Sequence, residues 1–295
     1  MSSFILAADL HIRSDRPRCR IDEDWEKTQE LMIKEIVSIA NEYKVPLIIT
    51  GDLFDTPNIP SRFIVMLIEQ FNKINTTVHF LAGNHELPYH SLDNINNSSI
   101  GIFSALSKKH SKIIEGMDNF GTWHHFNSEY KENKTDLLFT HELIFENSKS
   151  IPPNVNAKTA QDILDEHKKM KWIFTGDNHK CFMFNNGGRY VINPGCAIRQ
   201  KTDEQDYKPS ILYVNTEKEK IKRIYLSDDI MMVDDNYIIE EKAKIDRITS
   251  FVEKIKKNEN VSLDFIENIE NSIKINKKLN KDTVKMIREL IEEEK

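Results

Sequence analysis

The chain has 295 residues, of which 30% are charged and 39% hydrophobic, and its formal net charge is −6. This length and composition predict a soluble globular protein with one large domain and an appendage. The negative charge argues against a basic surface for nucleic acid over the whole molecule, but bound divalent cations would still permit a DNA substrate.

Targeting segments and structural cysteines are not expected. No apolar run approaches the roughly 20 residues of a membrane helix, and the start lacks the basic segment of a signal peptide, so we expect a cytoplasmic protein. The cysteines, Cys19, Cys181 and Cys196, are odd in number and contain no CxxC pair. This pattern favours free thiols over a disulfide framework or a zinc knuckle.

A short apolar strand over residues 4–8 opens the chain and ends at Asp9 and His11. A basic stretch with Arg13, Arg16, Arg18 and Arg20 follows. These arginines either contact phosphates or form an exposed loop with solvated charges. A helix is predicted over residues 23–43, because its apolar residues recur with a helical period, and Asp22 is the predicted cap.

Two further strands end in polar clusters. The strand over residues 45–49 leads to Asp52 and Asp55, and prolines within residues 56–61 break the chain before a helix over residues 62–72. The strand over residues 78–82 leads to Asn84 and His85. Residues 87–99 are polar and irregular, which suggests a substrate-facing loop, and a helix over residues 100–110 and short strands at 112–114 and 122–126 follow.

The second half begins with strands over residues 137–140 and 172–175, which end at His141 and at Asp177 with His179. A helix is predicted between them, over residues 157–169. Hairpins then pair residues 181–184 with 189–192 and residues 210–214 with 220–225. A βαβ half followed by a β-rich half predicts an α/β fold, a four-layer α/β/β/α sandwich of two mixed sheets with flanking helices, over residues 1–226.

The composition changes after residue 226. Residues 227–240 are predicted as a linker, and residues 241–295 as a small C-terminal helical region with helices over 242–257, 262–275 and 280–293. Each helix has a narrow apolar stripe and the charges nearly balance. This pattern favours contact with a partner protein or the parent domain over contact with DNA.

Five predicted strands therefore end in residues that can bind metals. In stacked α/β folds the carboxyl ends of the strands share one edge, so we expect these residues to converge. Singly, each is more often a turn former, a helix cap or an ordinary histidine, but five such clusters in order are best explained by one site. The candidate metal ligands are Asp9, His11, Asp52, Asn84, His141, Asp177 and His179.

This ligand set contains oxygen and imidazole donors but no thiolate, which suits Mn²⁺, Fe or Zn²⁺ at a two-ion site with the ions roughly 3.5–4 Å apart. One carboxylate must then bridge the ions. Such a site lowers the pKa of a shared water and neutralises phosphoester oxygens during an in-line displacement. His85, beside the ligand Asn84, is the natural proton donor for the leaving oxygen.

The ordered motifs D-x-H, GDxxD, GNHE, a later His and GDxH resemble those of the calcineurin-like metallophosphoesterase superfamily over about residues 4–225. The resemblance implies that Asp52 bridges the ions, that His85 protonates the leaving group, and that Asp55 orients His85. It implies one ion on Asp9, His11, Asp52 and His179, and the other on Asp52, Asn84, His141 and Asp177.

The sequence departs from the family pattern at Asp177, where the family usually has histidine. Either the carboxylate replaces the imidazole and shifts the preference toward harder ions, or Asp177 does not bind and the second ion is held weakly. The metal identity is therefore open, with Mn²⁺ as the first expectation and Fe or Zn²⁺ as alternatives.

Within the superfamily, residues 51–61 and the segment Asn193 to Cys196, with Arg199 and Lys208 downstream, are similar to the nuclease subunit of the bacterial SbcCD complex and its relatives. This implies Mn²⁺-dependent cleavage of DNA phosphodiesters, as in DNA repair and recombination. The expected partners are DNA, an ATPase of the SbcC type that grips the C-terminal helices, and a second copy of the chain, with no membrane partner.

Two other functions stay open. One is a phosphoesterase of the same fold that acts on a phosphoprotein, a nucleotide or an RNA end, which the acidic net charge favours. The other is a non-catalytic scaffold subunit, against which the intact Asn84 and His85 argue. The sequence leaves open whether Glu86, His90 and Arg199 contact substrate.

Overall fold

The computed structural model describes residues 2–107, 111–113, 116–117, 122–124 and 135–227, with 234, 236–237, 239–240, 242–244, 246 and 273–274. The chain divides into two compact units, Met1–Asp235 and Asn236–Lys295. The helices predicted for the C-terminal region fall almost wholly outside the described residues. Within the described part, each helix is too short or too polar to cross a lipid bilayer.

The first of two large sheets has the strand order β14-β13-β1-β2-β3-β4. Its strands β1 to β4 are mutually parallel where they pair, and β13 is antiparallel to both β1 and β14. The strands are β1 (Ser3–Ala7), β2 (Leu47–Thr50), β3 (Val78–Leu81), β4 (Ser111–Ile113), β13 (Ser210–Asn215) and β14 (Lys220–Tyr225).

The second sheet has the order β11-β12-β10-β7-β6-β5 and is also mixed. Strand β10 runs parallel to β7 and β12, whereas β11 and β12 form an antiparallel hairpin. The strands are β5 (Gly116–Met117), β6 (Thr122–His124), β7 (Leu137–Thr140), β10 (Trp172–Phe174), β11 (Phe182–Asn186) and β12 (Arg189–Asn193). Two short strands, β8 (Ile144–Phe145) and β9 (Lys158–Thr159), pair separately.

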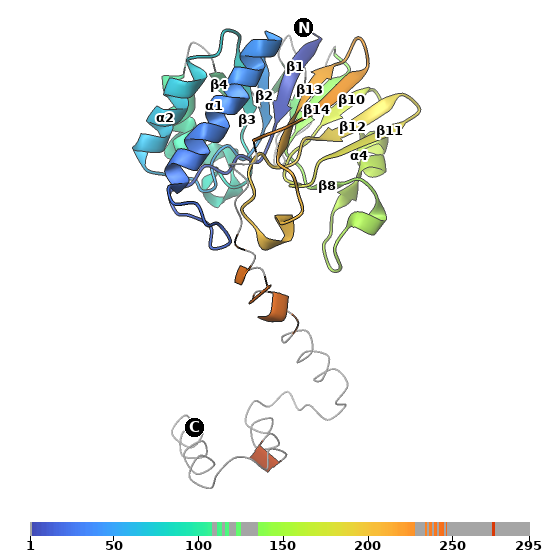
Figure 1. Cartoon of the computed structure of the whole chain (residues 1–295). Coiled ribbons are helices and arrows are strands. Elements are labelled where there is room, and N and C mark those ends of the chain that lie inside the picture. The colour runs from blue at the N-terminus through green and yellow to red at the C-terminus, as the bar shows by residue number, and fades with distance from the viewer. Residues whose placement is uncertain are drawn as a thin grey trace. The chain divides into compact units, whose positions relative to one another are not determined.

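Helices cover the outer faces of both sheets (Figure 1). Helices α1 (Trp25–Tyr43), α2 (Ser61–Phe71) and α3 (Ser99–Leu106) share a hydrophobic cluster with the first sheet, and α4 (Ala160–Glu166) shares one with the second. A third cluster lies between the sheets. The short 3-10 helices are η1 (Pro88–His90), η2 (Leu92–Asn97), η3 (Ser148–Ser150) and η4 (Thr202–Glu204).

Alternation along the strands explains the four layers. On β1, Phe4 and Leu6 belong to the cluster between the sheets, whereas Ile5 and Ala7 belong to the cluster under the helices. Because successive strand residues point to opposite faces, a strand that is apolar at every position must be covered on both sides. The predicted four-layer sandwich is confirmed.

Several local boundaries differ from the predictions. Helix α1 begins at residue 25 and not at 23, α4 ends at residue 166 and not at 169, and the segment predicted as irregular over residues 87–99 contains η1 and η2. The cap of α1 is Asp24, whose carboxylate accepts from Lys27 N, because the predicted cap Asp22 is instead buried against Arg20. Helix α4 begins three residues later than predicted, because Lys158–Thr159 is occupied in pairing with β8. The three cysteines are free, as predicted.

Candidate metal centre

Loops that follow five strands meet at one edge of the molecule. Figure 1 shows the segments after β1, β7 and β12 projecting from the same edge of the two sheets. The Thr50 hydroxyl at the end of β2 donates to the Thr175 carbonyl just after β10, at 3.1 Å, and so joins the two sheets there. The predicted convergence of the strand ends is confirmed.

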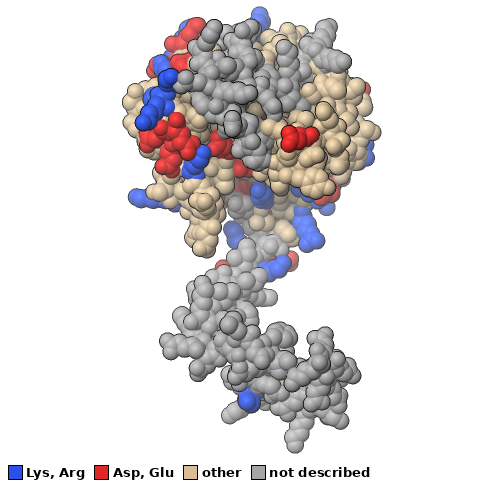
Figure 2. Space-filling model, turned by 180° about the vertical axis from the view of Figure 1, so that it is seen from behind, with Lys and Arg blue, Asp and Glu red and all other residues tan. Residues whose placement is uncertain are grey.

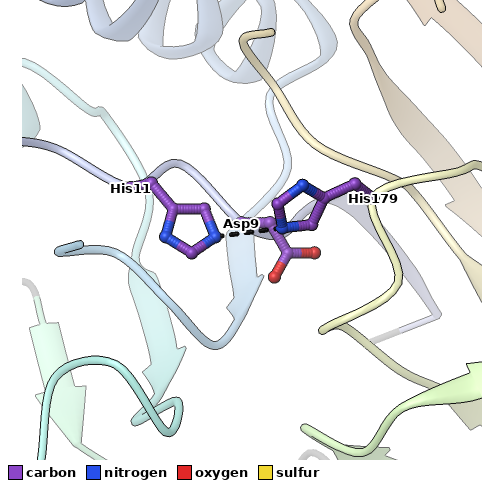
Figure 3. Close-up of side chains that lie close together, drawn as sticks. All are labelled: Asp9, His11 and His179. Carbon is purple, nitrogen blue, oxygen red and sulfur yellow. Dashed lines mark hydrogen bonds between the residues drawn. The ribbon is translucent and has the colours of Figure 1, made fainter. Parts of the chain in front are cut away.

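One group of candidate ligands combines Asp9, His11 and His179, whose donor atoms lie within 4.8 Å of one another. Figure 3 shows the imidazoles of His11 and His179 facing each other with the carboxylate of Asp9 beside them. The two Nε2 atoms are 3.1 Å apart. Two imidazole nitrogens and a carboxylate directed at one point form a set of donors that suits a divalent transition metal.

A second group combines Asp9, Asp52 and His141, and Asn84 and Asp177 adjoin it. Nε2 of His141 lies 3.3 Å from Oδ2 of Asp52, 3.2 Å from Oδ1 of Asn84 and 3.9 Å from Oδ1 of Asp177. Asp52 is also 3.7 Å from Nε2 of His11, so its carboxylate lies between the two groups. This is the position that a bridging carboxylate must occupy.

The imidazoles are held by their Nδ1 atoms. His141 Nδ1 donates to the Thr50 carbonyl at 2.7 Å, and His179 Nδ1 donates to the carboxylate of Glu204. Nδ1 of His11 lies 3.2 Å from Oδ1 of Asp55. Metal-binding histidines usually donate their second ring N–H to a carboxylate or carbonyl, which leaves the other nitrogen lone pair free for the ion.

The buried carboxylates are only half satisfied within the described residues. Oδ1 of Asp9 accepts from Asp177 N at 3.1 Å, and Oδ1 of Asp52 accepts from His85 N at 3.1 Å. Oδ2 of Asp9 has no hydrogen-bond partner in that part of the chain, and Oδ2 of Asp52 has only its contacts with the imidazoles of His141 and His11, at 3.3 and 3.7 Å. Because a buried carboxylate oxygen without a hydrogen-bond donor is costly, both carboxylates suit a bound cation.

The electrostatics agree with cation binding. Burial opposes protonation of His141, but the carboxylates of Asp52 and Asp9 nevertheless raise its pKa well above the usual value. Burial also raises the pKa of Asp9, with Asp52 adding to the effect. A field negative enough to hold a proton on a buried imidazole also attracts a divalent ion.

Four of these residues have left-handed backbone conformations: φ is 51° at Asp9, 45° at His11, 50° at Asp52 and 68° at Asp177. Residues other than glycine seldom adopt such angles, and each costs about 1–3 kcal/mol in the general case. The tight turns direct these side chains back over the strand ends.

Two glycines leave space for the ligands. A Cβ on Gly51 would lie 2.0 Å from Nδ1 of His141, and a Cβ on Gly83 would lie 2.0 Å from Oδ1 of Asp52. Any side chain at these positions would collide with a candidate ligand. The glycines that precede Asp52 and Asn84 are therefore part of the packing of the site.

The proton donor expected from the sequence, His85, is exposed beside the buried ligands. Asp55, which the resemblance assigns to orienting His85, contacts His85 through its main chain and not through its carboxylate. Nδ1 of His85 lies 3.1 Å from the backbone carbonyl of Asp55, whereas the Asp55 carboxylate contacts His11 and Nη1 of Arg13, at 3.2 and 3.1 Å. The cationic and imidazole groups attract the carboxylate, so the main chain takes over the positioning of His85.

Sequence reasoning missed Glu204. Its side chain is 2% exposed and accepts hydrogen bonds from Gln200 N and Lys201 N, at 2.6 and 3.0 Å, as well as from His179. Glu204 lies 25 residues beyond His179, in a segment without a strand-end pattern. Nothing in the one-dimensional sequence links the two.

Two of the residues left open are structural. Glu86 is fully buried and accepts from Phe54 N and Gly83 N, at 2.8 and 2.7 Å, and its burial beside Asp52 raises its pKa to about 8. Arg199 donates to the Gln205 carbonyl. The third, His90, is exposed and its Nδ1 lies 2.9 Å from the Asn84 carbonyl, so it braces the loop of a candidate ligand.

Most of the predicted arginine stretch is occupied by acidic or main-chain partners. Arg20 is 1% exposed and forms two hydrogen bonds of 2.7 Å with Asp22. Arg13 contacts Asp15 and Asp55, and Arg16 donates to the Asp22 carbonyl. The interpretation as an exposed loop with solvated charges fits Arg16 and Arg18, which are exposed, but is wrong for Arg20, whose charge is buried and paired with Asp22.

Comparison with known proteins identifies the scaffold. A family model described as calcineurin-like phosphoesterase matches residues 2–191. This chain belongs to the calcineurin-like phosphoesterase family. Members of this family typically bind two divalent ions, and the clusters described above are groups of residues that can hold them. Phosphoester hydrolysis is therefore the class of chemistry to which the site belongs. No curated protein matches the chain.

Several solved structures match most of this chain at low sequence identity. One is a novel archaeal phosphodiesterase, with 15% identity over 76% of this chain and 99% of that chain and a TM-score of 0.44. Another is the protein TT1561 of Thermus thermophilus, with 7% identity over 76% and 98% and a TM-score of 0.48. A third is a predicted phosphoesterase from Streptococcus pneumoniae, with 13% identity over 78% and 92% and a TM-score of 0.38.

Proposed function

We propose that this protein is a two-metal-dependent phosphodiester hydrolase and that its substrate is DNA. The observation that carries the proposal is the arrangement around Asp52, where the Nε2 atoms of His11 and His141 approach one carboxylate oxygen at 3.7 and 3.3 Å. Two bound divalent ions, with Mn²⁺ proposed first, would supply an activated water and offset charge on the phosphate oxygens.

The chain's own residues supply the remaining functions. His85 is exposed at the rim and its Nδ1 is directed to the Asp55 carbonyl, so Nε2 faces away from that contact. In the imidazolium form this nitrogen can donate a proton to the departing oxygen. Asp9 and Asp52 each keep Oδ1 on a backbone N–H, which fixes the direction of Oδ2.

The assignment to DNA rests on two observations. The first is the similarity of residues 51–61 to the nuclease subunit of the SbcCD complex; in the structure Thr56, Asn58 and Pro60 of this block, which follow Asp55 in the chain, are exposed. The second is that the exposed Lys180 and Lys201 adjoin His179. On the face shown in Figure 2, by contrast, described basic and acidic side chains lie next to one another, so phosphate contacts are expected at the site edge.

One assay tests the proposal. The purified full chain with Mn²⁺ is offered linear duplex DNA, single-stranded DNA, a phosphomonoester dye and a phosphodiester dye, with His85→Ala as the control. We expect hydrolysis of DNA and the diester, lost in the variant. Monoester turnover without DNA cleavage would reject the nuclease assignment in favour of another substrate, and the absence of any His85-dependent activity would favour a scaffold role.

We also propose that residues 241–295 contact an ATPase of the SbcC type and that the protein forms a homodimer. The resemblance to SbcCD-type nucleases supports both. A chain truncated after residue 240 should keep diester hydrolysis and lose co-purification with a co-expressed ATPase partner. Light scattering on the full chain gives the oligomeric state, and a monomer at all concentrations would reject the dimer.

A further inference from the structure

A second feature lies beside the metal centre, a pocket with a volume of about 510 Å³. Its walls come from the segments that follow β7, β10 and β12. Asp177 and His179 form one side, Phe145, Pro152 and Val155 form another, and Lys180 and Lys201 also line it. Pockets of this size accommodate small molecules or parts of larger ligands.

The position of the pocket limits what can occupy it. Because Asp177 and His179 are candidate metal ligands and also line the pocket, a phosphodiester held at the metal centre can extend one of its two substituents into the pocket. His85, the candidate proton donor, does not line the pocket and is exposed, which leaves an open side for the second substituent.

The walls of the pocket suit a flat aromatic group. Phe145 is partly exposed on β8, Val155 is 38% exposed, and Pro152 is exposed in the loop between them. These apolar surfaces face the solvent in the absence of a ligand. Aromatic and apolar side chains of this kind stack on nucleobases without selecting a particular base.

The polar groups of the pocket suit a nucleotide. Lys180 and Lys201 are exposed cations that can attract the next phosphate along a strand, and the exposed carboxylate of Glu146 can accept a hydrogen bond from a base edge. The wall is held in place by Asn178, whose side chain donates to the Ile144 carbonyl at 2.8 Å and accepts from Lys180 N at 3.1 Å.

We propose that this pocket binds one nucleobase of the substrate strand, next to the scissile phosphate. The inference rests on the proposed phosphodiesterase function and deepens it by adding a binding site for one base, which favours nucleotide diesters over simple alkyl diesters. Phe145 and Val155 are the residues that determine this selectivity, and Lys180 and Lys201 bind the adjoining phosphate.

The kinetic test uses four diesters with the same 4-nitrophenyl leaving group. Their second substituents are methyl, benzyl, thymidine joined through its 5′ oxygen and thymidine joined through its 3′ oxygen. We expect kcat/KM for one thymidine ester to exceed that for the methyl ester at least about tenfold, the scale of one stacked base. The Val155→Asp substitution, which replaces apolar wall surface with a carboxylate of similar size, and Phe145→Ala, which removes a stacking surface, should each reduce this ratio toward one. Val65→Asp, at a 51% exposed position on α2, is the matched control and should leave the ratio unchanged.

A binding test separates the pocket from the chemistry. Calorimetry compares thymidine 5′-monophosphate and thymidine 3′-monophosphate with methyl phosphate, with and without Mn²⁺, on the full chain and the same variants. Tighter binding of one nucleotide that disappears in Val155→Asp and Phe145→Ala would support the pocket even if no ester were hydrolysed, an outcome that rejects the proposed function alone.

Three results would overturn the inference. The first is hydrolysis of all esters without a thymidine preference, which keeps the phosphodiesterase function and rejects the base pocket. The second is a thymidine preference that neither pocket variant changes. The third is a kcat/KM for the benzyl ester equal to that for the thymidine ester. This result would show that the pocket accepts any aromatic group, including a protein side chain.

Discussion

Glu204 accepts a hydrogen bond from Nδ1 of His179 while its other carboxylate oxygen accepts from Gln200 N and Lys201 N. The carboxylate is thus fixed by the main chain on one side and fixes the imidazole on the other. Since His179 can direct its Nε2 to an ion only in this tautomer and orientation, Glu204 is a positioning residue for the metal centre.

Replacing Glu204 should weaken metal binding. Glu204→Gln keeps the shape but removes the charge, and we expect a loss of about 10–100-fold in metal affinity, the usual effect of removing such a partner. Titration of the apoprotein with Mn²⁺ by calorimetry measures it directly. The control is Glu219→Gln, where an exposed carboxylate pairs with Lys171 at 2.7 Å, away from the site. Equal affinities for the two variants would contradict the role of Glu204.

The loss of rate on removal of the proton donor should depend on the leaving group. With His85→Ala we expect kcat for DNA or an alkyl diester to fall by about 10²–10⁴-fold, the usual contribution of general acid catalysis. A nitrophenolate leaving group needs little protonation, so the fall in kcat for a nitrophenyl ester should be much smaller. His167→Asn, at the end of α4, is the control. A loss that is the same for all leaving groups would argue for a binding role instead.

The metal preference should follow residue 177. Asp177→His replaces a carboxylate that lies 3.9 Å from His141 with an imidazole, and we expect the ion giving the highest activity to shift from Mn²⁺ toward Zn²⁺ or Fe. Activity across a series of ions measures the shift, with Asp165→His on α4 for comparison. An unchanged ion order would mean that Asp177 is not a ligand.

The Gly83→Ala substitution should disturb the centre of the site. The added Cβ would meet Oδ1 and N of Asp52 at 2.0 and 2.4 Å, so Asp52 must move or the loop must shift. We expect a destabilisation of about 1–3 kcal/mol, as for other overpacked positions, together with weaker metal binding. Thermal unfolding measures the first and calorimetry the second.

The comparison for that variant is Gly188→Ala in the β11–β12 turn. Its added Cβ meets nothing within 4 Å, but its φ of +81° makes alanine strained. It should cost about 1–2 kcal/mol of stability and leave metal binding unchanged. If both variants kept full metal affinity, the contact between Gly83 and Asp52 would not matter for the site.

The buried pair of Arg20 and Asp22 should be important for stability. Arg20→Met leaves the carboxylate of Asp22, 2% exposed, without its charged partner, and breaking such a pair typically costs about 3–5 kcal/mol. Arg62→Met is the control, because the partner of Arg62, Glu26, is exposed and a surface pair is worth about 0–1 kcal/mol. Urea unfolding of both variants gives the difference. Similar losses would mean that the buried pair is no more important than the exposed one.

The sequence predicts much of this fold because its strands carry strong local patterns. Phe4 to Ala7 are apolar on both faces, and only a strand covered on both sides satisfies that pattern. The candidate ligands also follow from local rules, since each comes within five residues of a strand end. Parallel strands then bring their ends to one edge without further information.

The rest depends on contacts between distant residues. Asp22 and Asp24 are equally good caps by local rules, and only the burial of Arg20 decides between them. The carboxylate of Asp55 has His11, Arg13 and His85 within the same loop cluster, and the three-dimensional packing decides that it meets the first two. Glu204 reaches His179 through a turn that has no repeated pattern.

The left-handed backbone at Asp9, His11, Asp52 and Asp177 has a consequence for how this chain changes over time. At each of these positions glycine would relieve strain, so selection for folding stability alone favours the loss of the side chain. Only the function of the carboxylates and imidazoles opposes that tendency. A homologue that is no longer selected for catalysis should therefore acquire glycine or asparagine at these four positions early, before the residues of its hydrophobic layers change.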